Sequence, residues 1–122
     1  MSPGYLRPAL TMPQIYLYRQ PVDFRKQSHG LAAIVEGELG HNPFSGGLYV
    51  FTNRRYNRIK LLMWERNGFV LYYKALLEEK FIWPKGDEQV ISLTGQQINF
   101  LLDGLDIMAL RGHRKLVYES VF

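Results

Sequence analysis

The feature that most constrains the fold is the dipeptide Asn67-Gly68, which lies between two runs rich in apolar, aromatic and β-branched residues. These runs are Arg58–Arg66 and Phe69–Leu76. A two-residue type I′ turn requires positive φ at both central positions, and Asn-Gly is the pair that satisfies this most readily. The pattern therefore predicts a β-hairpin with its turn at Asn67-Gly68.

Counting outward from this turn gives a register for the hairpin. Trp64 pairs with Leu71, and Lys60 pairs with Ala75. Because successive side chains of a strand point to opposite faces, these pairs share one face of the predicted sheet. The register thus separates a nearly continuous apolar face from a mixed face.

A third strand, Leu48–Thr52, is predicted to fold back across the loop Asn53–Asn57 and to complete an antiparallel meander. In this arrangement Phe51 lies beside Ile59 on the apolar face. Short extended segments are also predicted at 14–19 and at 90–93. The second of these reads either as a last strand or as a lead-in to the following helix.

Two helices are predicted around the meander. Asp23 is a candidate N-cap for the first, which carries apolar residues at helical spacing and ends at Gly40. Thr94 and Gln97 form a capping box for the second helix, Gly95–Asp103. The sequence therefore predicts an α+β fold, a small antiparallel β-meander with two main helices packed on one face.

Length and composition predict one folded domain. The chain has 122 residues, of which 47% are hydrophobic and 21% charged, values that are ordinary for a globular protein. We assign residues 1–13, which contain three prolines, to a flexible N-terminal arm, 14–106 to a single α+β domain, and 107–122 to a partly ordered tail. Cysteine is absent, which excludes disulfides and thiolate metal sites. No apolar run is long enough to span a bilayer, so we expect a cytoplasmic protein without membrane contact.

The sequence offers no constellation for catalysis. Its 11 carboxylates are scattered and its 3 histidines are isolated. The one Gly-rich segment, Ser45–Gly47, leads into a predicted strand and has no following Lys-Ser or Lys-Thr, unlike a phosphate-binding loop. We therefore expect a protein that is not an enzyme, with no catalytic residues, no metal site and no cofactor.

Basic residues are concentrated at one end of the predicted meander, in a chain whose net charge is +4. Arg54, Arg55, Arg58 and Lys60 lie within seven positions of each other. Guanidinium groups bind phosphates in bidentate fashion, and nearby aromatic rings can stack on unpaired bases. The aromatic candidates are Tyr56, Trp64 and Tyr73. Spacing alone leaves an alternative open, in which the rings are core residues and the arginines solubilise a hairpin end.

Several motifs in series resemble a known family. They are, in order, PVDFRK (21–26), GLAAIV (30–35), NPFSGGLYVFTNRRYNRIKLL (42–62), GFVLYYK (68–74), FIWP (81–84) and LLDGLD (101–106). This set is similar to the second-frame, TnpB-type accessory proteins of the insertion-sequence-sixty-six family of bacterial transposable elements. The sequence departs from the family pattern after the hairpin, where Lys74-Ala75-Leu76-Leu77 replaces Lys-Arg-Leu-Glu.

The resemblance implies a protein that assists DNA transposition while a separate transposase performs strand transfer. DNA, with the element ends as target, and the transposase and other proteins of the same element are the partners it implies. Our candidate DNA-binding residues, taken from the basic cluster and the matching motifs, are Arg54, Arg55, Arg58, Lys60, Lys74, Arg25, Lys26 and Asn53.

A second hypothesis is a protein-interaction module that scaffolds the transposase complex without touching DNA. It requires the mixed face to stay exposed, and dimerisation of the chain is one way to bury that face. The residues of this face are Leu62, Trp64, Phe69, Leu71 and Tyr73.

Overall fold

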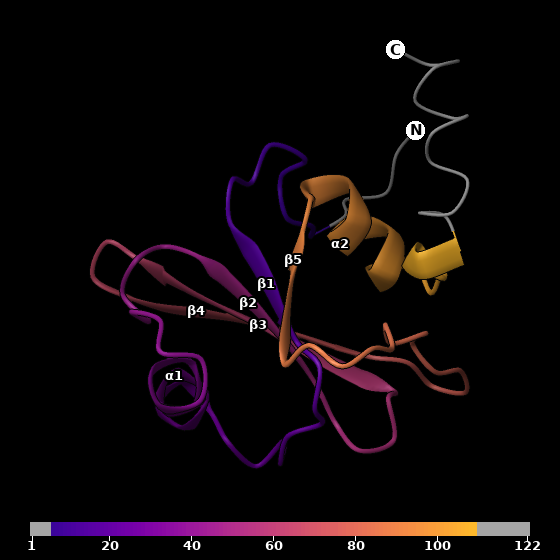
Figure 1. The fold of residues 1–122 in the computed structure, drawn as a ribbon, viewed down its shortest axis with the longest axis horizontal. Coiled ribbons are helices and arrows are strands. Elements are labelled where there is room, and N and C mark those ends of the chain that lie inside the picture. Colours follow the sequence, from indigo (N-terminus) through magenta and orange to yellow (C-terminus); the bar gives the residue numbers. More distant parts are fainter. Residues whose placement is uncertain (1–5, 110–122) are drawn as a thin grey trace.

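A five-stranded sheet forms the centre of the computed structural model, which describes residues 6–109 (Figure 1). The strands are β1 (Ile15–Tyr18), β2 (Leu48–Thr52), β3 (Arg58–Glu65), β4 (Gly68–Ala75) and β5 (Val90–Leu93). Their spatial order is β4-β3-β2-β1-β5. β1 runs parallel to β2, and the other neighbouring strands are antiparallel. The predicted three-stranded meander is thus confirmed as β2-β3-β4, and β1 and β5 extend it.

The helices that pack on the sheet are α1 (Ser28–Gly37) and α2 (Gly95–Leu102), and residues 107–109 at the end of the described part are also helical. The capping box predicted for α2 is present, since Thr94 Oγ1 accepts from Gln97 N at 3.0 Å and Gln97 Oε1 accepts from Thr94 N at 2.9 Å. α1 connects the parallel strands β1 and β2, as a crossover connection requires. The α+β class is confirmed. No helix within residues 6–109 has the length and apolarity needed to cross a membrane.

The helices cover opposite faces of the sheet, not one face as the sequence predicted. Figure 1 shows α1 on one side of the strands and α2 on the other. The α1 face buries Leu31 and Val35 of the helix against Tyr49, Phe51 and Leu62 of the strands. Because β2 lies between β1 and β3 and is covered on both faces, all five of its residues are buried.

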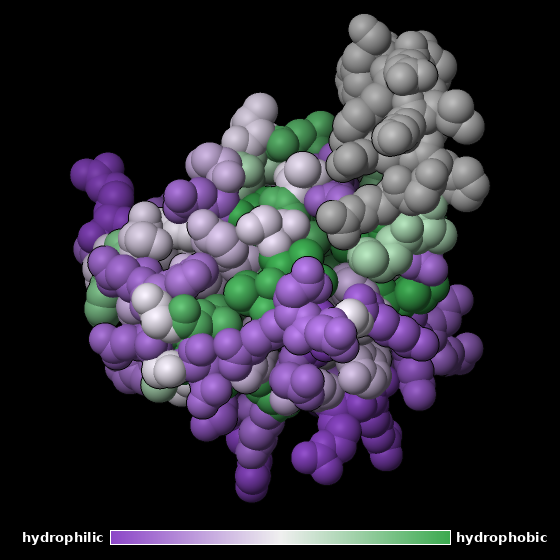
Figure 2. Space-filling view, in the orientation of Figure 1, coloured by the Kyte–Doolittle hydropathy of each residue, from purple (hydrophilic) through white to green (hydrophobic). Residues whose placement is uncertain are grey.

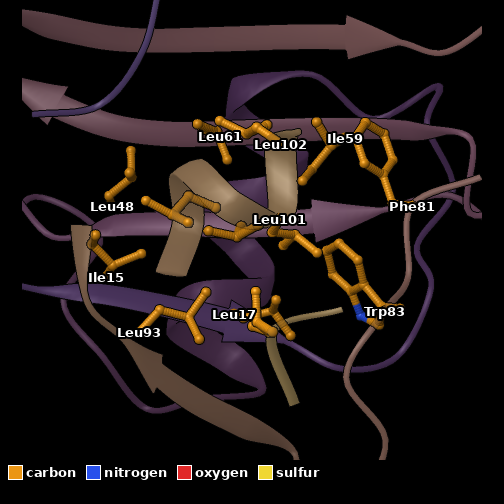
Figure 3. Packing of buried hydrophobic residues seen from close by; sticks show 13 residues of the cluster. Ile15, Leu17, Leu48, Ile59, Leu61, Phe81, Trp83, Leu93, Leu101 and Leu102 are labelled. Atoms are coloured by element: carbon orange, nitrogen blue, oxygen red, sulfur yellow. The ribbon is translucent and has the colours of Figure 1, made fainter. Parts of the chain in front are cut away.

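The α2 face is the larger and more aliphatic part of the core. Figure 3 shows Leu101 and Leu102 of α2 pointing toward Ile59, Leu61 and the strands beside them. Two aromatic residues from the segment after β4, Phe81 and Trp83, close one side of this cluster. The Trp83 indole Nε1 donates to the Arg19 carbonyl at 3.0 Å, which leaves its buried polar atom satisfied.

The β3–β4 turn is one residue earlier than predicted. Glu65 pairs with Gly68 and Trp64 with Phe69, so Arg66 and Asn67 form the turn. Arg66 is the turn residue with positive φ, at 55°. The register differs by two residues from the predicted one, and because side chains alternate with a period of two, every residue keeps its predicted face.

The β2–β3 register differs by one residue, which has the opposite consequence. Phe51 pairs with Lys60 and Thr52 with Ile59, so the side chains of β2 point to the faces opposite to those predicted. In this register the loop is closed by Thr52 Oγ1 and Asn53 N, which both donate to the Arg58 carbonyl, at 3.0 and 3.4 Å.

Asp23 does not cap α1. The helix begins at Ser28, and Gln27 occupies the N-cap position without a side-chain hydrogen bond. Asp23 instead forms a turn of its own, in which its Oδ1 accepts from Arg25 N at 2.9 Å and its carbonyl accepts from Lys26 N at 3.0 Å. The segment between β1 and α1 is therefore a structured loop.

Residues 6–12, assigned to a flexible arm from the sequence, run along α2. Asn99 Nδ2 donates to the Pro8 carbonyl at 3.0 Å, and Arg7 forms an ion pair with Asp103 at 2.7 Å. A Cβ on Gly95 would lie 2.3 Å from the Leu10 carbonyl oxygen, so only glycine allows this approach. Of the C-terminal tail, Ile107 is buried in the core, and residues 110–122, with their basic group Arg111, Arg114 and Lys115, lie outside the described residues.

Candidate nucleic-acid interface

The loop between β2 and β3 is built around Asn53. Its Oδ1 accepts from the backbone amides of Asn57 and Arg58, both at 3.1 Å, and its Nδ2 donates to Asn57 Oδ1 at 2.7 Å. Tyr56 takes a positive φ of 59° to complete the turn. Because the Asn53 amide is used within the loop, it acts as a brace for the neighbouring arginines and does not project as a recognition group.

The loop between β1 and α1 is held beside this arginine loop by two attachments. Val22 N donates to the carbonyl of Thr52, the last residue of β2, at 2.9 Å. The Lys60 ammonium donates to the carbonyls of Phe24 at 3.0 Å and Lys26 at 2.8 Å. Two segments that are about thirty residues apart in the sequence are thereby fixed next to each other.

The two loops line an open hollow of about 400 Å³, which we call the basic hollow. The sequence-predicted residues Asn53, Arg54, Arg55 and Arg25 all contribute to its lining, together with Pro21, Val22, Asp23 and Phe24. Figure 2 shows strongly hydrophilic residues projecting along the lower margin of the molecule, where Figure 1 places these two loops. The structure therefore brings four of the eight candidate residues to one concave surface.

The electrostatics of the basic hollow are dominated by arginine. Arg54 and Arg55 are exposed and, within residues 6–109, form no ion pair. Arg25 is bound by Asp23 through an ion pair of 2.7 Å. The hydrogen bonds and charge of Arg25 lower the pKa of the Asp23 carboxyl to about 2. The pair is close to neutral, so Arg54 and Arg55 supply the uncompensated charge.

Two further candidates lie beside the basic hollow without lining it. Arg58 is exposed at the start of β3, directly after the arginine loop. Lys26 is exposed at the end of the β1–α1 loop, and its carbonyl is one of the two that Lys60 binds. Both can extend a positively charged surface outward from the hollow.

Lys60 occupies a different place from the one the sequence suggested. It is 4% exposed, lies on the α1 face, and its ammonium is 4.9 Å from the centre of the Phe24 ring. Burial lowers the pKa of Lys60, because desolvation disfavours the charged amine. Its ammonium is directed to two backbone carbonyls inside the protein, so its contribution to the site is to position the β1–α1 loop.

Lys74 is also turned inward. It lies on the α2 face, where its ammonium donates to the carbonyl of Leu102 at 2.8 Å. Leu102 is the last residue of α2, and a cation at this end of a helix satisfies a free carbonyl and complements the helix dipole. Burial lowers the pKa of Lys74 as well. Lys74 therefore serves the fold, at a distance from the basic hollow.

The aromatic candidates do not form a stacking platform at the hollow. Trp64 packs edge to face with Phe44 and Phe69, with ring centres 4.9 and 5.0 Å away. Tyr73 is half exposed and packs against Phe24, with ring centres 6.2 Å apart. Tyr56 is partly buried against the α2-side core. The mixed face is only partly free, since Leu62 is buried under α1 whereas Tyr73 is half exposed.

Sequence reasoning missed a second hollow that adjoins the basic one at Pro21. It has a volume of about 360 Å³, and three basic residues, Arg19, Lys80 and Lys85, line it together with Tyr56, Phe81 and Trp83. These basic residues come from segments before α1 and after β4, and neither segment has a local pattern that indicates proximity to the other. Hydrogen bonds from Trp83 Nε1 to the Arg19 carbonyl, at 3.0 Å, and from Phe81 N to the Tyr56 carbonyl, at 2.7 Å, hold these segments together.

Comparison with known proteins gives a consistent identification. The family described as IS66 Orf2 like protein matches residues 13–112. The relative named "Uncharacterized protein y4jC" of Sinorhizobium fredii (strain NBRC 101917 / NGR234) is 33% identical over 93 residues, which are 76% of this chain and 80% of that protein. "Uncharacterized protein y4hO" of the same strain is 29% identical over 93 residues, 76% of this chain and 81% of the relative.

No solved structure matches the chain. The family match covers most of the chain and includes both loops of the basic hollow, all five strands and both helices. It also agrees with the resemblance found from the motifs. The chain belongs to the IS66 Orf2-like proteins, a family of transposition-associated accessory proteins.

Proposed function

We propose that this protein assists transposition of its insertion sequence by binding DNA backbone phosphates at the basic hollow. The observation that carries the proposal is the convergence of Arg25, Arg54 and Arg55 on one concave surface from two separate loops. Arginine is suited to phosphate because its planar fork donates two parallel hydrogen bonds. The loops are fixed by backbone and lysine hydrogen bonds, so little conformational entropy is lost when a phosphate binds.

The arrangement favours recognition of the phosphate backbone over reading of bases. The Asn53 and Asn57 side chains, which are the neutral hydrogen-bonding groups of the arginine loop, bind each other and the loop backbone. Phosphate contacts position a protein on DNA and carry no direct sequence information. We infer that any preference for the element ends comes from DNA shape or from the transposase.

The test is binding of the purified protein to labelled element-end duplex and to a shuffled duplex across a salt series. Each neutralised phosphate contributes about −0.9 to the slope of log affinity against log salt, so contacts from Arg54, Arg55 and the neighbouring Arg58 give about −2.7. Replacing Arg54 and Arg55 together by Ala should reduce the magnitude of this slope by about 1.8. An unchanged slope in this double variant, with the fold intact, would overturn the proposal.

Arg66→Asn is the matched control. Arg66 is exposed at the opposite end of β3 and has a positive φ, which Asn tolerates. The substitution removes one positive charge without disturbing the basic hollow. It should leave the salt slope within about 0.3 of the parent value if binding depends on the hollow and not on overall charge.

A scaffold for the transposase complex is the second candidate function, and one observation favours it. Phe44, Trp64 and Phe69 line an apolar hollow of about 390 Å³ next to α1, and Phe44 is 55% exposed. Exposed aromatic clusters of this kind often contact a partner protein. If the scaffold function is correct, Phe44→Ala will weaken capture of the purified transposase while Arg54→Ala with Arg55→Ala will not.

A further inference from the structure

β4 is an end strand of the sheet, and its outer edge has a defined set of free backbone groups. The Leu76 amide donates to the Asn57 carbonyl, which makes this a hydrogen-bonded position of the β3–β4 ladder. Hydrogen-bonded and non-hydrogen-bonded pairs alternate along an antiparallel ladder. The pairs that include Phe69, Leu71, Tyr73 and Ala75 are therefore non-hydrogen-bonded ones. These four residues point their N–H and C=O groups away from β3, and no other described strand pairs with them.

This edge has one of the devices that usually prevent edge strands from pairing, an inward-pointing lysine, but it has neither a short strand nor a proline. β4 is eight residues long and contains no proline. Its single charged residue is Lys74, and the ammonium of that lysine is bound to the Leu102 carbonyl, on the α2 face. Inward charges, short length, proline and bulges are the common protections of an edge. The opposite edge strand, β5, has only four residues and is protected by its length.

We propose that β4 pairs with β4 of a second copy of this chain in antiparallel orientation, with the twofold axis at Tyr72. The two five-stranded sheets then join into one continuous sheet. In this register Phe69 pairs with the partner's Ala75 and Leu71 with the partner's Tyr73. Each of the four pairs built from outward-pointing residues exchanges two backbone hydrogen bonds, for a total of about eight.

The side chains of the edge are compatible with self-pairing. Lys74 lies opposite the partner's Val70 and not opposite another lysine, so no like charges meet across the strand pair. Val70 is 45% exposed and Tyr73 is 50% exposed, on the two different faces of the sheet. Pairing places Tyr73 opposite the partner's Leu71, and Val70 beside the aliphatic stem of the partner's Lys74. The strand is thus complementary to itself in both its backbone and its charges.

The dimer has a consequence for the basic hollow. A twofold axis normal to the sheet keeps equivalent faces on the same side, and Lys60 attaches the Phe24–Lys26 loop on the α1 face. Both copies would then present their basic hollows to one side of the joined sheet. The use of this arrangement for DNA binding rests on the proposed function. The strand pairing itself does not depend on that function.

Sedimentation velocity of the purified full chain over a concentration series tests the pairing without DNA. The parent protein should shift from monomer to dimer as concentration rises. Val70→Lys places a lysine opposite the partner's Lys74 and should raise the dissociation constant at least tenfold, while Val70→Thr should leave it within threefold. A parent that stays monomeric at every concentration, or a dimer that Val70→Lys does not weaken, would overturn the proposal.

Cross-linking tests the register, because the chain contains no cysteine. Tyr72 should face the partner's Tyr72 as a non-hydrogen-bonded pair with Cα atoms about 4.5 Å apart, within the range of a disulfide. Tyr72→Cys should form a dimer on oxidation that is visible on a non-reducing gel, and Val70→Cys should not. Tyr72 packs partly against the core, so circular dichroism must confirm folding of the variant. A folded Tyr72→Cys variant that gives no more cross-link than Val70→Cys would overturn the register.

Discussion

The two sides of the sheet use a buried lysine for different purposes. Lys60 in β3 extends into the α1 side and binds the carbonyls of the irregular Phe24–Lys26 loop. Lys74 in β4 extends into the α2 side and binds the last carbonyl of a regular helix. The α2 side is otherwise a closed aliphatic core, and the α1 side supports the loops of the basic hollow. The comparison indicates that stability and binding can be perturbed separately.

The largest expected effect is on the α2 side. Leu101 is fully buried between α2 and the strands, and Leu101→Ala should lower the free energy of unfolding by about 3 kcal/mol, because it removes buried methyl groups and leaves a cavity. Urea denaturation measures this change. DNA affinity of the folded fraction should be unaltered. Leu105→Ala, at a 43% exposed position, is the control and should cost less than about 0.5 kcal/mol.

Lys60→Met should affect both stability and binding. The substitution keeps the apolar stem and leaves the carbonyls of Phe24 and Lys26 without their donor, at a cost of about 2 kcal/mol. The Arg25 side of the basic hollow should then become mobile, and DNA affinity should fall several-fold, as fluorescence anisotropy would reveal. A variant that is destabilised but binds DNA as tightly as the parent would show that the loop needs no such support.

Lys74→Met is the counterpart on the α2 side. It leaves the Leu102 carbonyl without the lysine and should cost about 1 kcal/mol, measured by the same urea denaturation. Because Lys74 is not part of the basic hollow, we expect the salt slope and affinity for DNA to match those of the parent. A loss of DNA binding equal to that of Lys60→Met would remove the distinction between the two sides.

The smallest effect concerns protonation at the edge of the basic hollow. The Asp23 pKa is lowered to about 2 by Arg25, so the stabilisation from this pair is complete above pH 3.8 and is lost as the pH falls through about 2. Carbon-detected NMR of the Asp23 carboxyl should give a midpoint near 2. In Arg25→Ala the midpoint should move up toward the ordinary value of 3.8. An unchanged midpoint would mean that Arg25 is not the cause.

The parts of the fold that depend on local chemistry were predictable from the sequence. The capping box of α2 needs only Thr94 and Gln97, and both its bonds are present. The β3–β4 hairpin was also predicted, although its turn is one residue earlier because Arg66, and not Gly68, takes the positive φ. The two-residue difference in register left the faces unchanged, so the prediction of which β3 and β4 side chains share a face is confirmed, whereas the predicted cross-strand pairs are wrong.

The parts that depend on distant contacts were not predictable. The pairing of β1 with β2 and β5 joins segments from both ends of the domain, and no local pattern specifies it. The inward orientation of Lys60 also depends on a distant contact. In the sequence, a lysine close to several arginines suggests a surface cluster, but in the structure its ammonium binds the carbonyls of Phe24 and Lys26. At the site, Arg25, Arg54 and Arg55 line one hollow in the structure because the β1–α1 and β2–β3 loops are neighbours, and their role in binding DNA stays a prediction. The second hollow with Arg19, Lys80 and Lys85 was not predicted.

The position of β1 between β2 and β5 also bears on how the chain acquires its structure during synthesis. β1 leaves the ribosome before β2, β3 and β4, and β5 leaves it after all of them. Until β5 emerges, one edge of β1 and the apolar groups beside it are without their partner. Folds dominated by contacts between distant segments form slowly, and incomplete sheets are prone to aggregate. We therefore expect a chain that ends before β5 to be insoluble, even though it contains the entire basic hollow.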